Sequence, residues 1–379
     1  MDHEEKCATA EESQSPTILS RLWDPIKDQW FLIVLVVLVI FSSQIQVPEA
    51  QQDLKSRIVQ NLTIAVIFFI NGLATQTGDL VANIRRWRCH VFIQVVGFVF
   101  TSLTMFGVVA AIATNQALMD PLLLNGLVVL GCLPTAFSIN TVMTRKAKGN
   151  ATLTLTESVI GNAIGPFLSS MLVLGYTSID IWYTEGMPTA AGGLGKLLQR
   201  VFAQFGLTLI LPLAIGQLVQ HFFSETVKKL LHDYHFIKFG PLSLLVLIWS
   251  GYDSAFASHA FADVEKTQII GVIVICVSLF LLWMLVTIAT SVAFLGREDA
   301  VAAAFCIPTK SPALGIPLAT ILFAGMSAED TAKVYIPLVI FQFVQTCLSN
   351  LATIPLRRWR AKAACPTDSN KMSDSDSLA

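Results

Sequence analysis

Long apolar blocks separated by short polar stretches run along most of this chain. A bilayer core of about 30 Å is crossed by about 20 helical residues, and apolar runs of that length recur along the sequence. They predict ten membrane-spanning helices, so the pattern indicates an all-α integral membrane protein. The predicted spans are residues 29–47, 58–75, 90–113, 121–145, 151–176, 200–222, 239–257, 267–293, 299–326 and 331–355.

The two ends of the chain are polar. Residues 1–20 and 359–379 have no capacity to build a core, so each is expected to be a tail. Residues 21–358 are expected to form one transmembrane domain. The first stretch lacks the basic-then-apolar order of a signal peptide, so the first apolar segment is expected to stay as an anchor.

Basic residues fall mainly on one side of the predicted spans, and this asymmetry sets the orientation of a membrane protein. The loops after spans 2, 4 and 6 and the stretch after span 10 are basic, whereas the opposite loops hold fewer Lys and Arg. Both termini are therefore expected in the cytoplasm. The basic positions are Arg85, Arg86, Arg88, Arg145, Lys146, Lys148, Lys228, Lys229, Lys238, Arg357, Arg358, Arg360 and Lys362.

The composition supports the membrane assignment and narrows the function. Hydrophobic residues make up 54% of the chain and charged residues 13%, about half the usual charged fraction of soluble proteins. Scattered basic residues and a net charge of −1 give no reason to expect a nucleic-acid partner, so membrane lipid is the expected surrounding. The cysteines and histidines show no metal or disulfide spacing, and no nucleophile elbow or phosphate loop is present. The sequence predicts neither an enzyme nor a cofactor.

Two predicted spans are interrupted, and each is the fourth in its half of the chain. The first break, GCLPTAFSINTVMTRKAKGN (131–150), contains Pro134, and the second, FCIPTKSPALGIPLA (305–319), contains Pro308, Pro312 and Lys310. Five spans per half force the halves into opposite orientations, which is the pattern of an inverted-repeat transporter with its site at the broken helices. Two unrelated proline kinks are the alternative. Polar residues in both breaks favour a site: Thr135, Ser138, Asn140, Thr141, Thr144, Thr309 and Ser311.

Lys310 is the most informative single residue. A lysine near the bilayer centre costs about 2.5–3.5 kcal/mol on insertion scales, so it needs a carboxylate, a ring of carbonyl groups or a water-filled pocket. Glu157 in span 5 is the candidate carboxylate, and helical spacing places Thr154 and Ser158 on the same face; snorkelling of Glu157 to water is the alternative. Asn71 in span 2 could line the cavity or bond a neighbouring helix.

The broken segments and their neighbours resemble the bile acid:sodium symporter superfamily. Within it, the chain is most similar to the SBF-like branch, which includes the seventh-member solute carrier of the sodium/bile-acid family and fungal regulators of cytosolic calcium. The resemblance covers about residues 25–358. It is carried by KDQWFLIVLVVLVI, IFFINGLATQTGDL, GCLPTAFSINTVMTRKAKGN and KSPALGIPLATILFAG.

The resemblance implies ten helices in two inverted five-helix repeats, with discontinuous helices 4 and 9 crossing in a core domain beside a smaller panel domain. It places the ligands of one sodium site on Asn140, Thr141, Thr154 and Ser158. The second site departs from the family pattern, because its acidic residue and glutamine correspond to Cys306 and Lys310. A thiol and an ammonium cannot coordinate a hard cation, so Lys310 is expected to stand where that sodium would.

The resemblance also implies a role as a negative regulator of cytosolic calcium, acting by alternating access at the broken-helix site. The plasma membrane is the expected location, with the Golgi, another endomembrane or the vacuole as alternatives. A calcium cage needs several carboxylates, so another small ion or an organic anion is expected as cargo. The alternatives are a sodium- or proton-coupled symporter of an organic anion and a non-transporting scaffold that binds a calcium channel.

Overall fold

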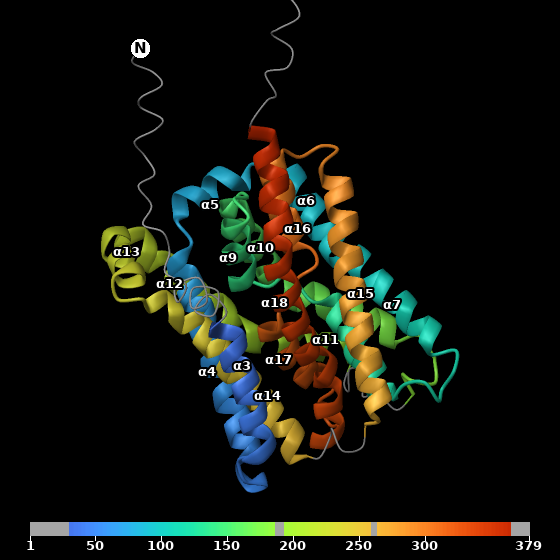
Figure 1. Cartoon of the computed structure of the whole chain (residues 1–379). Coiled ribbons are helices and arrows are strands. Elements are labelled where there is room, and N and C mark those ends of the chain that lie inside the picture. Colours follow the sequence, from blue (N-terminus) through green and yellow to red (C-terminus); the bar gives the residue numbers. More distant parts are fainter. Residues whose placement is uncertain (1–29, 186–192, 259–263, 365–379) are drawn as a thin grey trace, which may run out of the picture.

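The computed structural model describes residues 30–185, 193–258 and 264–364, and every regular element in these ranges is a helix (Figure 1). The tail predicted at 1–20 lies outside the described residues. At the other end, helix α18 (Ala328–Ala364) continues past the domain boundary predicted at residue 358.

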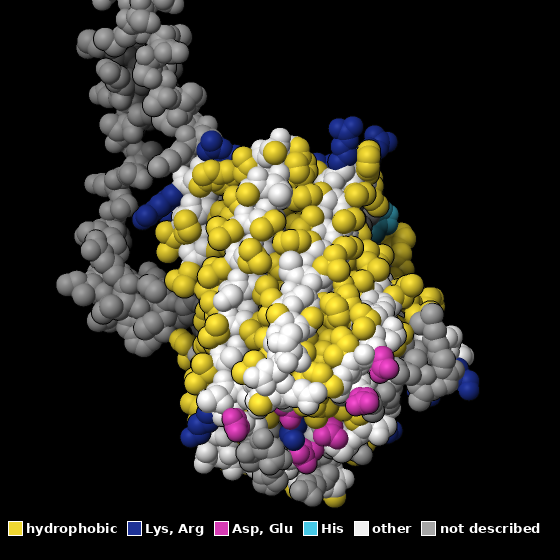
Figure 2. All heavy atoms as spheres, turned by 90° about the vertical axis from the view of Figure 1, so that its right-hand side faces the viewer, with side chains coloured by type: hydrophobic (Ala, Val, Ile, Leu, Met, Phe, Trp, Pro, Cys, Tyr) yellow, Lys and Arg dark blue, Asp and Glu magenta, His cyan; other side chains and the backbone are white. Residues whose placement is uncertain are grey.

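Six helical stretches of the described chain are long and apolar enough to cross a membrane, and shorter apolar helices accompany them. Large hydrophobic side chains cover much of the outer surface (Figure 2), which a bilayer would solvate and water would not. The expectation of an all-helical integral membrane protein is confirmed. The six stretches are Ala50–Ala74, Trp87–Ile112, Ala151–Thr177, Leu198–Phe222, Lys266–Ser291 and Glu329–Ala361.

One group of helices forms around α4 and is called the α4 group here. It consists of α3 (Trp30–Gln44), α4 (Glu49–Ala74), α12 (Leu211–Phe222) and α14 (Phe239–Ala257). Helices α4 and α12 touch through glycines: a Cβ on Gly216 would lie 2.4 Å from the Phe69 carbonyl oxygen, and one on Gly72 would lie 2.4 Å from that of Leu213. Small residues at such a crossing let two backbones pack directly in a membrane.

A buried ion pair closes one end of the α4 group. The Asp253 carboxylate on α14 lies 2.5 Å from the Lys55 ammonium on α4. It also accepts hydrogen bonds from the Val47 amide (3.0 Å) and the Gln52 side chain (2.8 Å). Because each charge has a partner and further hydrogen bonds, the pair can be held out of water and can tie the α3–α4 connection to α14.

The second group is built around two broken helices and is called the crossover group. Helices α8 and α18 pack together at its centre, with α7, α10 and α15 around them (Figure 1). Its members are α7 (Thr101–Ile112), α8 (Pro121–Cys132), α9 (Ser138–Lys146), α10 (Ala151–Thr177), α15 (Lys266–Ser291), α16 (Arg297–Cys306), α17 (Pro312–Leu322) and α18.

Shorter elements connect these helices. The stretch from α4 to α7 passes through α5 (Thr77–Ile84), α6 (Trp87–Val95) and the π-helical turn η1 (Val96–Phe100). Another π-helical turn, η2, separates α11 from α12. The remaining elements are α11 (Gly193–Phe205), η2 (Gly206–Ile210), α13 (Ser224–His232) and η3 (Phe236–Lys238).

Proline chemistry explains where the helices break. Pro134 has no amide hydrogen and disfavours helical backbone at the residue before it; accordingly, α8 ends at Cys132 and Leu133 is extended. Pro312 occupies the first helical position of α17 after an extended Ser311, a place that proline tolerates. Away from the breaks, Asp120 caps α8 and Asn150 caps α10 through side-chain hydrogen bonds.

The glycine crossing between α4 and α12 yields a stability prediction. Gly216→Ala places a methyl group against backbone atoms that cannot rotate away, so it should lower the free energy of unfolding by about 1–3 kcal/mol. The control is Gly107→Ala on α7, where nothing lies within 4 Å and the substitution favours the helix. Thermal unfolding of the purified proteins measures the difference, and equal midpoints for the two variants would contradict the direct contact.

Candidate functional site

The two breaks cross and pair with each other through their backbones. The amide of Ser311 donates to the carbonyl of Pro134 (2.9 Å), and the amide of Ala136 contacts the carbonyl of Thr309 at 3.4 Å. Segments that lie more than 170 residues apart in the sequence thus share two backbone contacts, which fixes the crossing of the fourth and ninth predicted spans.

The carbonyl groups freed at the first break are satisfied by side chains. Unpaired backbone groups are costly where water is absent, and here Cys132 accepts from Ser169 (2.7 Å) and Thr135 accepts from Asn162 (3.0 Å). Ala136 accepts from Asn140 (2.5 Å). Much of the polarity of these spans therefore serves the broken backbone.

The second break is held by a glutamine of α18. The Gln345 side chain accepts from the Lys310 amide (2.7 Å) and donates to the Lys310 carbonyl (2.9 Å). The side chain thus bonds both backbone groups of Lys310, as a neighbouring β-strand would do. Gln345 also donates to the side chain of Gln342, one turn away on the same helix, so α18 fixes the backbone on both sides of Lys310.

The Lys310 side chain is buried among oxygen atoms. Its ammonium lies 2.7 Å from the Gly97 carbonyl, 2.7 Å from the Thr101 hydroxyl and 3.0 Å from the Leu133 carbonyl. The ring of Trp283 lies 5.4 Å away, within the range of a cation–π contact. An ammonium has three donors, and three acceptors surround it here.

The π-helical turn η1 explains why Gly97 can serve as an acceptor. In a regular helix, the Thr101 amide would bond the Gly97 carbonyl four residues earlier. Here that amide instead contacts the carbonyls of Phe98 and Val96. The Gly97 oxygen is left for the Thr101 hydroxyl and the Lys310 ammonium, which is the kind of local irregularity that often marks a functional site.

Of the partners that the sequence allows for Lys310, a ring of carbonyl groups is the one found, and the candidate carboxylate Glu157 pairs with other residues. Glu157 is fully buried on α10, and its carboxylate lies 2.5 Å from Nδ1 of His90 and 2.9 Å from the Gln94 amide. The other ring nitrogen of His90 lies 2.9 Å from the Asn83 carbonyl. Glu157 thus pairs with residues of α6 and does not reach water by snorkelling. Lys310 needs no carboxylate partner, because backbone carbonyls accept the hydrogen bonds of its ammonium.

Most of the other expected site residues lie together behind the crossing. Asn140 donates to Thr135 (2.5 Å) and accepts from Thr309 (2.5 Å), which links the two breaks directly. Nearby, Thr154 contacts Thr144 at 3.0 Å and Ser158 contacts the Ala136 carbonyl at 3.3 Å. Thr141, one residue from Asn140, is also buried. The amide oxygen of Asn162 is buried there without a hydrogen-bond partner among the described residues.

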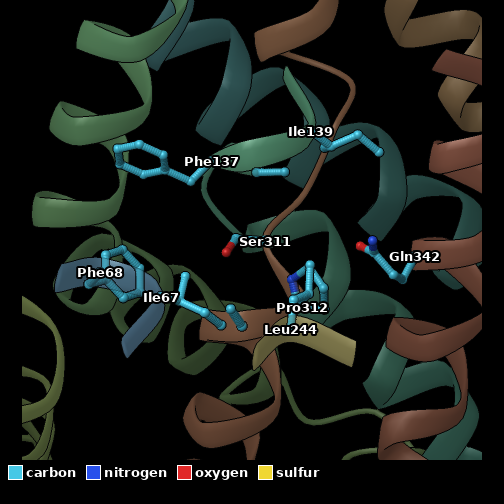
Figure 3. Close-up of a pocket in the computed structure, with 10 residues that line it drawn as sticks. Ile67, Phe68, Phe137, Ile139, Leu244, Ser311, Pro312 and Gln342 are labelled. Carbon is cyan, nitrogen blue, oxygen red and sulfur yellow. The ribbon is translucent and has the colours of Figure 1, made fainter. Parts of the chain in front are cut away.

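Two expected residues lie elsewhere. Asn71 is buried on α4, so it belongs to the α4 group and not to the cluster behind the crossing. Ser311 opens onto a cavity of about 30 Å³ between the two helix groups, where α4 and α14 face the breaks (Figure 3). Phe68, Leu244 and Gln342 form other parts of its wall, and that volume is enough for about one or two water molecules.

Several residues of this site are not among the predicted ones. His90 stands at the beginning of a predicted span without a motif around it, whereas Gln342 and Gln345 carry a signal, because their spacing in FQFVQT places two amides near one helix face. Thr101 and Gly97 gave no signal, because a π-helical turn cannot be recognised in an apolar run such as VGFVFT. Cys306 is buried at the end of α16.

The new pairing of Glu157 can be tested with double-mutant cycles. The variants His90→Ala and Glu157→Gln should show a coupling free energy of about 0.5–3 kcal/mol, because the two residues touch. Lys310→Met combined with Glu157→Gln should be additive to within about 0.5 kcal/mol. Unfolding of the purified single and double variants measures both values. Strong coupling to Lys310 and none to His90 would restore the original pairing.

The oxygen shell of Lys310 predicts a chemical rescue. In Lys310→Ala the carbonyls of Gly97 and Leu133 lose the ammonium, and Gly97 keeps only the Thr101 hydroxyl, so the variant should unfold at a lower temperature than wild type. Methylammonium should raise its unfolding midpoint by binding the vacated shell, while wild type, whose shell is filled by Lys310, should not respond to methylammonium. N-methylglucamine, which is too large to enter, is the control cation. An equal response of wild type and variant would contradict a preformed cation shell.

Comparisons with known proteins identify the family of this chain. The model of the SBF-like CPA transporter family matches residues 29–358. The chain is 29% identical to solute carrier RCH1 of Candida albicans, over 97% of this chain and 98% of the relative. It is 29% identical to solute carrier RCH1 of Saccharomyces cerevisiae, over 92% and 89% respectively.

Mammalian proteins are similar over nearly the same region. The chain is 27% identical to sodium/bile acid cotransporter 7 of Rattus norvegicus, over 89% of this chain and 95% of the relative. The family model covers both broken helices, the lysine shell and the cluster behind the crossing. The chain therefore belongs to the SBF-like CPA transporter family.

Proposed function

We propose that this protein is a carrier that works by alternating access at the crossing of its broken helices and thereby lowers cytosolic calcium. The observation that carries the proposal is the pair of crossing breaks, with buried polar groups behind them and a cavity in front. Membrane proteins tolerate broken backbone at this depth where it is surrounded by protein or lines a cavity. We propose the arrangement of ten spans in two inverted repeats for the same reason.

The α4 group is the proposed panel, and the crossover group is the proposed moving core. The cluster behind the crossing, which includes Asn140, Thr154 and Ser158, is the proposed site for a small coupling ion. Its hydroxyl and amide oxygens are suitable ligands for a hard cation, and the unpartnered Asn162 oxygen supports a ligand there. At the family's second sodium position, Lys310 is the proposed replacement for the ion, so coupling to two sodium ions does not fit this chain.

An organic anion is the proposed cargo class. Helices α9 and α17 begin beside the cavity, and neither start has a side-chain cap. Helix starts carry partial positive charge, and the walls contributed by Phe68 and Leu244 suit an apolar body. Because the cavity has room for water-sized groups alone, such an anion would enter after the two helix groups move apart.

We infer that calcium is affected indirectly. A calcium cage wants several carboxylates, and Glu157, the carboxylate on α10 near the crossing, is already bonded to His90 and Gln94. The calcium role itself rests on the resemblance to fungal regulators of cytosolic calcium. The proposed location is the plasma membrane, with the Golgi or vacuole as alternatives, and the basic end of the molecule is assigned to the cytoplasm.

A calcium-pulse experiment tests the proposal. In cells lacking the protein, wild type should restrain the rise of cytosolic calcium after an external pulse, and Lys310→Ala should lose at least half of that restraint at matched surface levels. Ser311→Val, which narrows the cavity without touching the lysine shell, should lose restraint as well. The matched control is Lys228→Ala, an exposed lysine on α13.

The outcomes separate a carrier from a scaffold. Loss of restraint in Lys310→Ala and Ser311→Val, with Lys228→Ala active, supports function through the crossing. Full restraint by both site variants would overturn the proposal and favour a scaffold that binds a calcium channel through another surface. If Lys310→Ala does not reach the membrane, Ser311→Val decides.

A further inference from the structure

A short motif occurs twice in this chain. Residues 85–88 and residues 357–360 both read Arg-Arg-Trp-Arg. The first copy begins at the end of α5 and runs into the start of α6, and the second lies in the last turns of α18. The copies are separated by about 270 residues, yet the fold brings both to one end of the molecule.

Both copies attach to the acidic start of α16. Arg86 of the first copy forms a two-point ion pair with Asp299, one contact of which is 3.1 Å. Arg360 of the second copy pairs with Glu298. Arg297, the residue before Glu298, lies 5.1 Å from the ring of Trp359 and donates to its backbone carbonyl (2.9 Å). The start of a broken helix is thus held between the two motifs.

Each motif keeps two further arginines on the surface. Arg85 and Arg88 are exposed in the first copy, and Arg357 and Arg358 are exposed in the second. Glu298 and Asp299 are already engaged by the other two arginines of the motifs, so these four side chains add positive charge to the surface. On the face drawn in Figure 2, Lys and Arg side chains lie at this end without Asp or Glu beside them, whereas charges of both signs lie at the opposite end.

The motifs lie at the edge of the exposed apolar surface. Trp87 is 63% exposed, and tryptophan favours the level of the lipid headgroups. One turn further along α6, Val91 is 52% exposed; on α18, Ile354 and Leu351 are 55% and 66% exposed. A lipid whose chains lie on these apolar faces would place its headgroup beside the exposed arginines.

We propose that the two motifs form a binding site for the headgroup of an anionic phospholipid in the leaflet at this end of the molecule. Arginine binds phosphate oxygens through paired hydrogen bonds, and clusters of basic residues next to a spanning helix attract acidic lipids. Glu298 and Asp299 hold the motifs together, while the exposed arginines contact the lipid. Because the motifs also hold the start of α16, the bound lipid is in a position to stabilise the broken helix.

The test measures the affinity of purified full-length protein for fluorescent phosphatidylserine in detergent micelles, with phosphatidylcholine as the neutral lipid. Changing Arg85, Arg88, Arg357 and Arg358 to Gln should weaken phosphatidylserine binding by about fivefold for each arginine removed. Binding should also weaken as salt is raised. Each motif is also changed alone, as R85Q/R88Q and R357Q/R358Q, so that the test stands if the fourfold variant does not fold.

The control variant is K229Q/K238Q, which removes two exposed lysines, one on α13 and one on η3, outside both motifs. It should bind phosphatidylserine as wild type does. Unchanged affinity in the motif variants, or an equal loss in the control, would overturn the proposal. Glycerophosphoserine, the headgroup without chains, should compete weakly; equal competition at equal concentration would assign the site to a soluble anion and not to a lipid.

Discussion

Broken backbone inside a membrane is the constraint on which this structure depends. Water is absent there, so every freed carbonyl needs a partner from the chain itself. The Lys310 ammonium bonds one of these carbonyls, the Gln345 side chain on α18 bonds a second, and the Asn162 side chain on α10 bonds a third. The polar residues of the crossing therefore serve first to bond the backbone groups that the breaks leave free. Binding of an ion or an anion would use the same residues.

Helix α18 connects these contacts to the rest of the molecule. Its 37 residues extend over about 55 Å at 1.5 Å per residue. Gln345, near the middle of this helix, bonds the backbone of the second break. Trp359 and Arg360, near the end of the helix, contact the start of α16. The same helix thus contacts the start of α16 and the break that follows it. Because Gln345 bonds the break and Gln342 lines the cavity, a displacement of α18 would change both.

The sequence predicted the large features well because they follow from composition and proline chemistry. The apolar runs indicated the helices, and Pro134 and Pro312 located the breaks. The expected site residues of the breaks and of α10 are mostly adjacent in space. The partners of charged groups were harder. Glu157 pairs with His90 because α6 lies against α10, and Lys310 finds carbonyls because η1 departs from α-helical geometry. Lys55 lies between two predicted spans, so nothing in the sequence indicates that tertiary packing buries it against Asp253.

The covalent attachment of Lys310 has an electrical consequence. A sodium ion is released after each transport cycle, so an ordinary symporter returns without that charge. An ammonium that belongs to the chain travels in both directions if the crossing moves across the membrane field. If a monovalent anion moved without a coupling ion, its charge would neutralise that ammonium, and the empty return would carry the net charge. Membrane voltage, worth about 2.3 kcal/mol per charge per 100 mV, would act mainly on the step at which no cargo is bound.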